Sequence, residues 1–211
     1  MKTDLSSYTF LIPARKGSKG VPYKNRKLIN KTIDSIPIKL RDSILISTDD
    51  EVIKQKHNNL KIHNRSEKNA QDTSSMKDLM LEIKNDIEME NIILLYTTYP
   101  ERTFKDILDA VSFYEKNNSS SLLCKKELEV SPFLMMYESG IKGKQIIKHN
   151  LYRRQDYPKC FEISHFVCVF SMKELDKLNS NLYNEDTIFY PICDKIDIDT
   201  LQDLERYNEK N

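Results

Sequence analysis

Four short, mostly apolar runs that read as strands, separated by segments with helical spacing, place the strongest constraint on how this chain can fold. The runs are residues 8–12, 43–47, 91–96 and 120–124. Continuous apolar runs of this length, rich in β-branched and aromatic residues, are typical of strands buried on both faces of a sheet. Residues 73–88 and the segment that opens at Thr103 have the periodicity of helices. This alternation predicts an α/β fold of three layers, with a doubly wound, mostly parallel sheet between helices.

Residues 130–170 break this rhythm. Short apolar runs alternate there with turn signals at Ser139-Gly140 and Lys142-Gly143, which indicates a small hairpin arm within one domain that spans residues 1–211. Because an exposed hairpin rich in Phe, Met and Tyr needs covering, we expect this arm to form a homodimer. A helix from Met172, a closing strand at 196–198 and a helix capped by Thr200 are expected to complete the domain.

Charge and composition restrict the partners. The 33 Lys and Arg nearly balance the 32 Asp and Glu, so the chain has no general attraction for nucleic acid or for an anionic membrane. No run approaches the roughly 18 apolar residues that a membrane helix needs, and the first residues have no signal-peptide pattern. The four cysteines are scattered without a C-x-x-C pair. These features predict a cytoplasmic protein without a disulfide framework or a zinc site.

A basic loop follows the first predicted strand. It contains two of the chain's four glycines, a hydroxyl and several cations: Ala14, Arg15, Lys16, Gly17, Ser18, Lys19 and Gly20. Glycines let backbone N–H groups approach phosphate oxygens, and Arg15 and Lys19 can neutralise the phosphate charge. The spacing of a Walker A loop is absent. The segment is either a basic surface turn or a nucleotide site, and its position directly after the first strand favours the nucleotide site.

Two aspartates near the end of the chain form a second candidate site. Asp197 and Asp199 lie two residues apart, which on a strand places both carboxylates on one face. Such a pair suits Mg²⁺, which binds carboxylates together with phosphate oxygens of a substrate. The alternative is that Asp199 only caps the helix that follows.

Arginines provide two further candidate anion sites. Arg153 and Arg154, followed by Gln155 on the predicted arm, can grip a carboxylate or a phosphate. The alternative for these residues is a solvated run of charge. Arg102, just past the third strand, either faces the ligand or lies on the surface near the start of a helix.

The four histidines show no metal-ligand spacing. His57 and His63 lie in a polar stretch rich in Lys and Asn, so we expect their side chains in solvent. His165, close to the apolar Ile163 and Phe166, is expected to have a structural role. No Ser/His/Asp triad can be argued from the sequence.

Taken together, these segments resemble the acylneuraminate cytidylyltransferases, the CMP-sialic acid synthetase family. The resemblance lies in residues 12–25 (IPARKGSKGVPYKN), 46–51 (ISTDDE), 71–75 (QDTSS) with Arg65, 153–158 (RRQDYP) and 196–200 (IDIDT). These matches run in order along nearly the whole chain. The resemblance implies a Rossmann-like nucleotidyltransferase fold and a cytoplasmic, Mg²⁺-dependent enzyme that binds CTP and an acidic sugar as a homodimer.

The resemblance also implies a reaction, in which the anomeric hydroxyl of an acidic 2-keto sugar attacks the α-phosphorus of CTP and releases pyrophosphate. Arg15, Lys19 and Asp199 are the implied catalytic residues, and Asp197 and Asp199 the implied ligands of Mg²⁺. The implied nucleotide site comprises Ala14, Arg15, Gly17, Ser18, Lys19, Gly20, Lys24, Asn25, Arg65 and Ser75. The implied substrate-binding residues are Tyr96, Arg102, Arg153, Arg154 and Gln155, with Arg154 supplied by the partner chain.

The sequence departs from that family after the third strand. Where the family usually has Gln-Pro-Thr-Ser-Pro-Leu-Arg, this chain has YTTYPER at residues 96–102, so Tyr96 replaces the glutamine and Glu101 adds a negative charge. Sialic, legionaminic and pseudaminic acids therefore all remain open as acceptors, as does a different acidic or phosphorylated acceptor. A non-catalytic nucleotide-binding homologue and a sugar-1-phosphate nucleotidyltransferase are the alternative functions.

Overall fold

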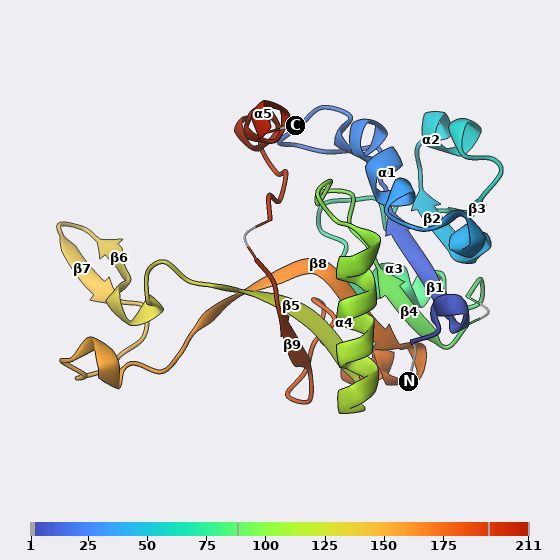
Figure 1. The fold of residues 1–211 in the computed structure, drawn as a ribbon. Coiled ribbons are helices and arrows are strands. Elements are labelled where there is room, and N and C mark those ends of the chain that lie inside the picture. The colour runs from blue at the N-terminus through green and yellow to red at the C-terminus, as the bar shows by residue number, and fades with distance from the viewer. Residues whose placement is uncertain (1–2, 88, 194, 211) are drawn as a thin grey trace.

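The computed structural model describes residues 3–87, 89–193 and 195–210. Its body is built on a seven-stranded sheet of order β3-β2-β1-β4-β8-β5-β9 (Figure 1). The strands are β1 (Tyr8–Pro13), β2 (Ile44–Thr48), β3 (Lys61–Asn64), β4 (Asn91–Leu94), β5 (Ser121–Glu127), β8 (Phe161–Ser171) and β9 (Ile188–Pro191). Only β8 runs against its neighbours, β4 and β5, and the other pairs are parallel. The prediction of a mostly parallel sheet is confirmed.

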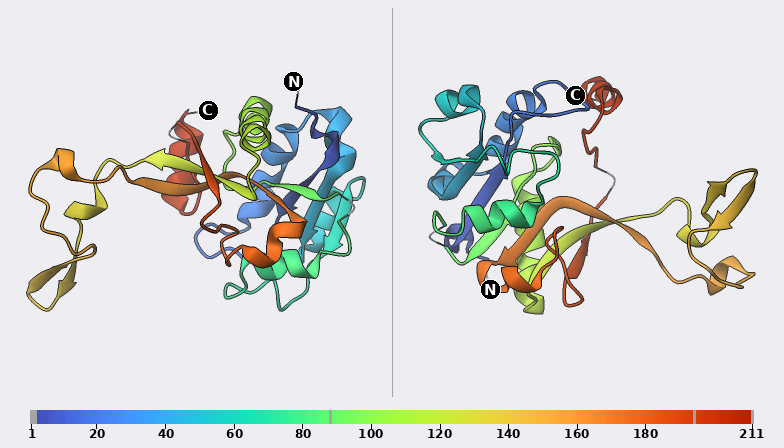
Figure 2. Two further views of the ribbon diagram at one scale, coloured as in Figure 1. Left: turned by 90° about the horizontal axis from the view of Figure 1, so that it is seen from below. Right: turned by 180° about the vertical axis from the view of Figure 1, so that it is seen from behind.

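Helices cover both faces of this sheet, as the two views in Figure 2 show. The α-helices are α1 (Lys24–Asp34), α2 (Glu51–Lys56), α3 (Met76–Glu82), α4 (Phe104–Asn117) and α5 (Leu201–Lys210). Because successive strand side chains point to opposite faces, Phe10 and Ile12 pack with α1, α2 and α4, whereas Leu11 packs with α3. The predicted three-layer arrangement is therefore confirmed.

Side-chain caps set where α2, α3 and α4 begin. At α4, Thr103 accepts from the backbone N–H of Asp106, whose carboxylate accepts in return from Thr103, which forms a capping box. Ser75 and Asp78 form the same motif at α3. The cap at Ser75 explains why α3 begins at Met76, and α3 ends at Glu82. The predicted helix over residues 73–88 is wrong at both ends, since residues 73–75 and 83–87 are not helical; residue 88 lies outside the described residues.

The last part of the chain differs from expectation in three ways. The predicted helix from Met172 is the short 3-10 helix η5 (Met172–Lys177). Residues 196–198 are not a strand. Their backbone bonds to the loop after β4 instead, since the N–H of Ile198 donates to the carbonyl of Thr98 at 2.9 Å. The sheet is closed by β9, which pairs with β5 and was not predicted.

A hairpin arm is present within the predicted residues 130–170 and projects away from the body (Figure 1, yellow to orange), whereas residues 161–170 belong to β8 of the sheet. Its antiparallel hairpin consists of β6 (Met136–Ser139) and β7 (Lys142–Gln145). The 3-10 helices η3 (Pro132–Leu134) and η4 (Arg154–Asp156) lie on either side of it in the sequence. Several large apolar side chains of the arm are exposed, among them Met136, Tyr137, Ile141 and Tyr152.

The expectation that His57 and His63 lie in solvent is wrong, because both side chains are buried. The Nδ1 atom of His63 lies 3.0 Å from the hydroxyl of Ser47 on the adjacent strand. Nε2 of His57 is buried and has no hydrogen-bond partner among the described residues.

No helix in the described part of the chain is long and apolar enough to cross a membrane. The sulfurs of Cys124, Cys160, Cys168 and Cys193 are free thiols.

Candidate active site

A cavity of about 260 Å³ lies at the carboxyl ends of β1, β3 and β4. Four parts of the chain line it: the loop after β1 with the first turn of α1, the segment from Arg65 to Met76, the loop after β4, and Asp199. Ligands of open α/β sheets bind at this edge. The cavity therefore lies where the sequence predicts a nucleotide site.

The start of the loop after β1 is fixed by hydrogen bonds to neighbouring elements. The N–H of Ala14 donates to the carbonyl of Ser47 at 2.8 Å, and the hydroxyl of Thr48 donates to the carbonyl of Ala14 at 2.5 Å. The amide of Asn25, in the first turn of α1, donates to the carbonyl of Arg15 at 2.7 Å. Arg15 and Asn25, two predicted nucleotide-binding residues, are held together in this way.

The two loop glycines have different surroundings. A Cβ atom at Gly17 would meet no atom within 4 Å, so this backbone is open to a ligand. A Cβ at Gly20 would lie 1.9 Å from the backbone oxygen of Asp199. Only glycine permits this approach, which brings residues from the two ends of the chain into contact.

Lys24 strengthens the same contact. Its ammonium group donates to a carboxylate oxygen of Asp199 at 2.8 Å and to the carbonyl of Ile198 at 2.9 Å. Ile198 also packs in a small apolar cluster with Val21 and with Tyr207 of α5. The Lys24 side chain is mostly buried, whereas that of Asp199 is 70% exposed. The Asp199 carboxylate is therefore accessible to a ligand.

The cations predicted to bind phosphate, Arg15 and Lys19, both pair with the carboxylate of Asp72. The guanidinium of Arg15 contacts one oxygen, and the ammonium of Lys19 lies 2.6 Å from the other. The hydrogen bond from Lys19, followed in size by the one from Arg15, lowers the pKa of the Asp72 carboxyl group. Sequence reasoning did not single out Asp72, although it lies within the segment 71–75 that carries the resemblance.

Arg65 and Tyr96 line the cavity, whereas Ser75 does not. The Nε of Arg65 donates to the carbonyl of Asn69 at 2.7 Å, and burial lowers the pKa of its guanidinium. The ring of Tyr96 packs edge-on against His165, with centroids 5.5 Å apart, and burial raises the pKa of its phenol. Ser75 serves as the cap of α3.

Arg102 lies in the core rather than in the cavity, with 3% of its surface exposed. Its Nε donates to the carbonyl of Phe166 and its Nη2 to the carbonyl of Tyr96, each at 2.7 Å. Burial lowers the pKa of this guanidinium to about 10. These contacts join the loop after β4 to β8, so the geometry of Arg102 is that of a structural residue.

The arginines of the arm are not brought to this cavity within one chain. Arg153 forms a two-point ion pair with Asp156, with both nitrogen–oxygen distances 2.9 Å. Arg154 and Gln155 are exposed on η4, and neither residue lines the cavity. The arm to which η4 belongs projects away from the body (Figure 1).

The two predicted metal ligands have different environments. Asp199 lines the cavity, whereas Oδ1 of Asp197 is buried and has no hydrogen-bond partner among the described residues. The described residues contain no cluster of three or more His, Cys, Asp or Glu that could hold a metal ion. A buried carboxylate oxygen without a partner and an accessible carboxylate two residues away fit the donor preference of Mg²⁺, provided that substrate and water supply its other ligands.

Known proteins resemble this chain in sequence. It is 26% identical to the N-acylneuraminate cytidylyltransferase of Streptococcus agalactiae over 92% of this chain and 51% of that protein. The chain thus spans about half the length of this relative. It is also 26% identical to the post-translational flagellin modification protein B of Campylobacter coli, over 87% of this chain and 85% of that protein.

The fold is shared with a solved CMP:2-keto-3-deoxy-manno-octonic acid synthetase complexed with CTP. The TM-score is 0.67 at 13% identity, and the match covers 96% of this chain and 97% of that one. The model of the cytidylyltransferase family matches residues 9–161, which include the basic loop, the strands β1 to β5 and most of the arm. The chain therefore belongs to the cytidylyltransferase family.

Proposed function

We propose that this chain transfers CMP from CTP to the anomeric hydroxyl of an acidic 2-keto sugar of the sialic, legionaminic or pseudaminic acid type and releases pyrophosphate. The observation that carries the proposal is the arrangement of one cavity, where the basic loop faces Asp199 from the other end of the chain. The name of the Streptococcus agalactiae relative, N-acylneuraminate cytidylyltransferase, supports an acidic sugar as the acceptor.

The proposed nucleotide site uses cations and backbone groups. Arg15 and Lys19 share one carboxylate, that of Asp72, so their positive charges already converge on a single anionic group. A triphosphate, with more charge than one carboxylate, replaces Asp72 there. The open backbone at Gly17 lets N–H groups reach the phosphate oxygens. Transfer of this kind depends mainly on positioning and charge neutralisation, so no strong base is required of the chain.

Asp197 and Asp199 are the residues that would hold Mg²⁺. When bound, the ion neutralises charge on the triphosphate and on the departing pyrophosphate. Lys24 orients Asp199 through its hydrogen bond of 2.8 Å and adds a positive charge beside it. The amide of Asn25 donates to the carbonyl of Arg15 and accepts from the hydroxyl of Thr97, so this side chain stays next to the loop after β1. We place the cytidine beside it.

The proposed enzyme is a cytoplasmic homodimer in which residues 1–211 form one domain. The exposed apolar side chains of the arm supply the dimer contact. Arg153, Arg154 and Gln155 do not line the cavity of their own chain, so we assign them to the acceptor site of the partner chain. In that site they face the acceptor from one side, and Tyr96 of the chain that forms the cavity faces it from the other.

Pyrophosphate release tests the proposal directly. Purified protein is incubated with CTP, Mg²⁺ and each acid of a nonulosonic panel, and the CMP-sugar is identified by mass spectrometry. UTP, GTP and dTTP serve as matched controls. Turnover with CTP and one or more acids is expected. Absence of turnover with every acid, by folded protein that binds CTP, favours a non-catalytic homologue. Preference for another nucleotide favours a sugar-1-phosphate nucleotidyltransferase.

A further inference from the structure

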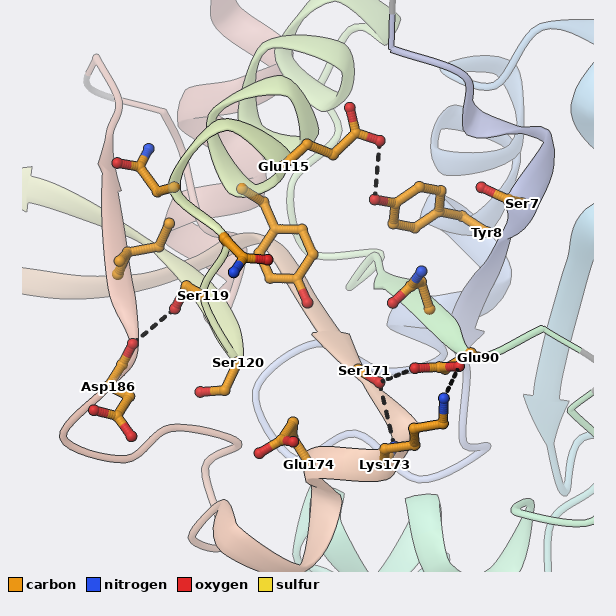
Figure 3. Close-up of a pocket in the computed structure, with 15 residues that line it drawn as sticks. Ser7, Tyr8, Glu90, Glu115, Ser119, Ser120, Ser171, Lys173, Glu174 and Asp186 are labelled. Atoms are coloured by element: carbon orange, nitrogen blue, oxygen red, sulfur yellow. Dashed lines mark hydrogen bonds and ion pairs between the residues drawn. The ribbon is translucent and has the colours of Figure 1, made fainter.

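At the opposite edge of the sheet, two of the carboxylates that line a second cavity of about 880 Å³ are bound by neighbouring groups (Figure 3). Glu90 pairs with Lys173, and Glu115 accepts a hydrogen bond from the hydroxyl of Tyr8 at 3.2 Å. Asp197 differs from these residues, because its Oδ1 atom is buried and has no hydrogen-bond partner among the described residues. A buried carboxylate oxygen without a partner is costly, so other contacts must hold the segment that carries Asp197.

The chain just before α5 is held against the loop after β4 at two points. The N–H of Ile196 donates to a carboxylate oxygen of Glu101 at 3.0 Å, and the N–H of Ile198 donates to the carbonyl of Thr98 at 2.9 Å. Asp197 lies between these two points. The acceptor of the first contact is charged, and such hydrogen bonds are roughly twice as strong as those between neutral groups. Glu101 therefore fixes the chain immediately before Asp197.

Burial alternates along this segment. The side chains of Ile196 and Ile198 are buried in the apolar cluster that contains Val21, whereas Asp199 is exposed and lines the candidate active site. Because alternate residues of an extended chain lie on the same side, Asp197 and Asp199 lie on the side opposite the cluster. The two N–H contacts set which residues lie on each side, so their loss would let the carboxylates turn away from the cavity.

The loop after β4 is itself anchored in the core. The buried guanidinium of Arg102 donates to the carbonyls of Tyr96 and Phe166, and the backbone N–H of Arg102 donates to the carbonyl of Tyr99 at 3.2 Å. The phenol of Tyr99 lies beside the carboxylate of Asp197, and burial, followed by the charge of Asp197, raises the pKa of this phenol. A loop fixed in this way determines where the segment that packs against it must lie.

We propose that Glu101 is a positioning residue, which holds Asp197 and Asp199 where both carboxylates can bind one divalent cation. The inference rests on the proposed function, in which these two aspartates bind Mg²⁺. Glu101 does not line the cavity and acts through the N–H of Ile196. The negative charge that Glu101 adds to the loop after β4 therefore serves as a backbone acceptor and does not face the acidic sugar.

Calorimetric titration with CTP tests this role without an acceptor sugar. The Kd of CTP is measured in Mg²⁺ and in EDTA, and the ratio of the two values reports how strongly the ion supports CTP binding. We expect Mg²⁺ to tighten CTP binding by the wild-type protein. Hydrogen exchange measured by NMR reports the contact itself, and the amide of Ile196 is expected to be protected in the wild-type protein.

Two variants separate position from charge. Glu101→Gln keeps the length of the side chain and an acceptor oxygen, so we expect the ratio to stay within about twofold of the wild-type value. Glu101→Asp keeps the charge but is one methylene shorter, so its oxygen falls short of the Ile196 N–H. We expect this variant to lower the ratio about tenfold, with an unchanged Kd in EDTA and faster exchange of the Ile196 amide. Thermal unfolding verifies that both variants remain folded.

The proposal is overturned if the three proteins have equal ratios, or if Glu101→Asp keeps the ratio and Glu101→Gln loses it. An unprotected Ile196 amide in the wild-type protein also overturns it. A wild-type Kd that does not change with Mg²⁺ overturns both this inference and the proposed metal site. Because no acceptor sugar is present, failure to transfer CMP to any nonulosonic acid counts against the proposed function alone.

Discussion

The backbone oxygen of Asp199 lies against Gly20, so close that a Cβ atom on the glycine would come within 1.9 Å of it. This contact brings the end of the chain to the loop that follows the first strand. Lys24 makes a second connection across the same boundary through its ion pair with Asp199. The proposed phosphate and metal sites are therefore held together by contacts that do not depend on a ligand.

Gly20→Ala is expected to disturb this junction. The added methyl group overlaps backbone rather than a flexible side chain, so the loop or residues 196–200 must move. We expect a loss of about 1–3 kcal/mol in the free energy of unfolding, as for other overpacked sites, measured by urea denaturation. Gly17→Ala is the control, because the space at Gly17 is open. Equal stability of the two variants would show that the contact between Gly20 and Asp199 can shift without loss of stability.

Asp72→Asn is expected to tighten CTP binding. In the free protein Asp72 occupies both Arg15 and Lys19, and the triphosphate must displace it. Loss of this competing charge should lower the Kd for CTP roughly threefold to tenfold, the magnitude expected for two exposed ion pairs. The affinity for CTP should also depend more steeply on salt concentration. Calorimetry measures both quantities. Weaker binding in Asp72→Asn would instead make Asp72 part of the nucleotide site.

Asp199→Asn is expected to remove most turnover and to leave the fold largely intact, since the Asp199 side chain is 70% exposed. We expect kcat to fall at least about a hundredfold, because charge on the triphosphate is no longer neutralised by a correctly held ion. Pyrophosphate release is measured as Mg²⁺ is titrated, with EDTA as the metal-free reference. Glu205→Gln, which changes a carboxylate outside the cavity, should retain wild-type turnover. Near-normal activity in Asp199→Asn would remove this carboxylate from the mechanism.

The arm predicts a site shared between two chains. Light scattering is expected to show a dimer at micromolar concentration. Arg154→Ala and Asp199→Asn should each be inactive alone, whereas mixed dimers should regain activity, since one of their two sites then combines an intact Asp199 with an intact Arg154. Co-purification with two different tags isolates the mixed dimers. An inactive mixed dimer, or a monomer, contradicts the shared site.

Burial of His57 predicts a loss of stability in mild acid. Burial, with a smaller effect of Lys56, lowers its pKa below the ordinary 6.5, so the unfolded chain binds a proton more readily than the folded one. Stability from this residue is present above pH 6.5 and is lost as the pH falls from that value through the lower pKa of the folded state. His57→Gln should therefore show a smaller drop in the free energy of unfolding between pH 7.5 and 5.5. An unchanged drop would mean that His57 does not titrate differently in the two states.

Local sequence patterns were sufficient to predict the inner strands and the first residues of several helices. The runs at residues 8–12 and 91–96 are mostly apolar because both faces of β1 and β4 are covered. The capping box at Thr103 acts within one helical turn. The edge strands β3 and β9 lie at the two ends of the sheet and are only partly buried, so their composition carries no strong period. The sequence alone therefore did not reveal them.

Contacts between distant residues explain the other differences. Burial of His57, His63 and Arg102 depends on which segments pack over them, and a polar flanking sequence does not report that packing. The position of Asp72 between Arg15 and Lys19 likewise arises only when the segment after β3 folds over the loop after β1.

The reversed direction of β8 has a consequence for how the chain folds. β8 is hydrogen-bonded to β4 on one side and to β5 on the other, so the middle of the sheet cannot form until the whole arm has closed as a loop. The entropic cost of closing that loop rises only slowly with its length, so a longer or shorter arm changes the free energy of unfolding little. Its effect falls mainly on the rate of folding, because pairings distant in sequence are slow to form.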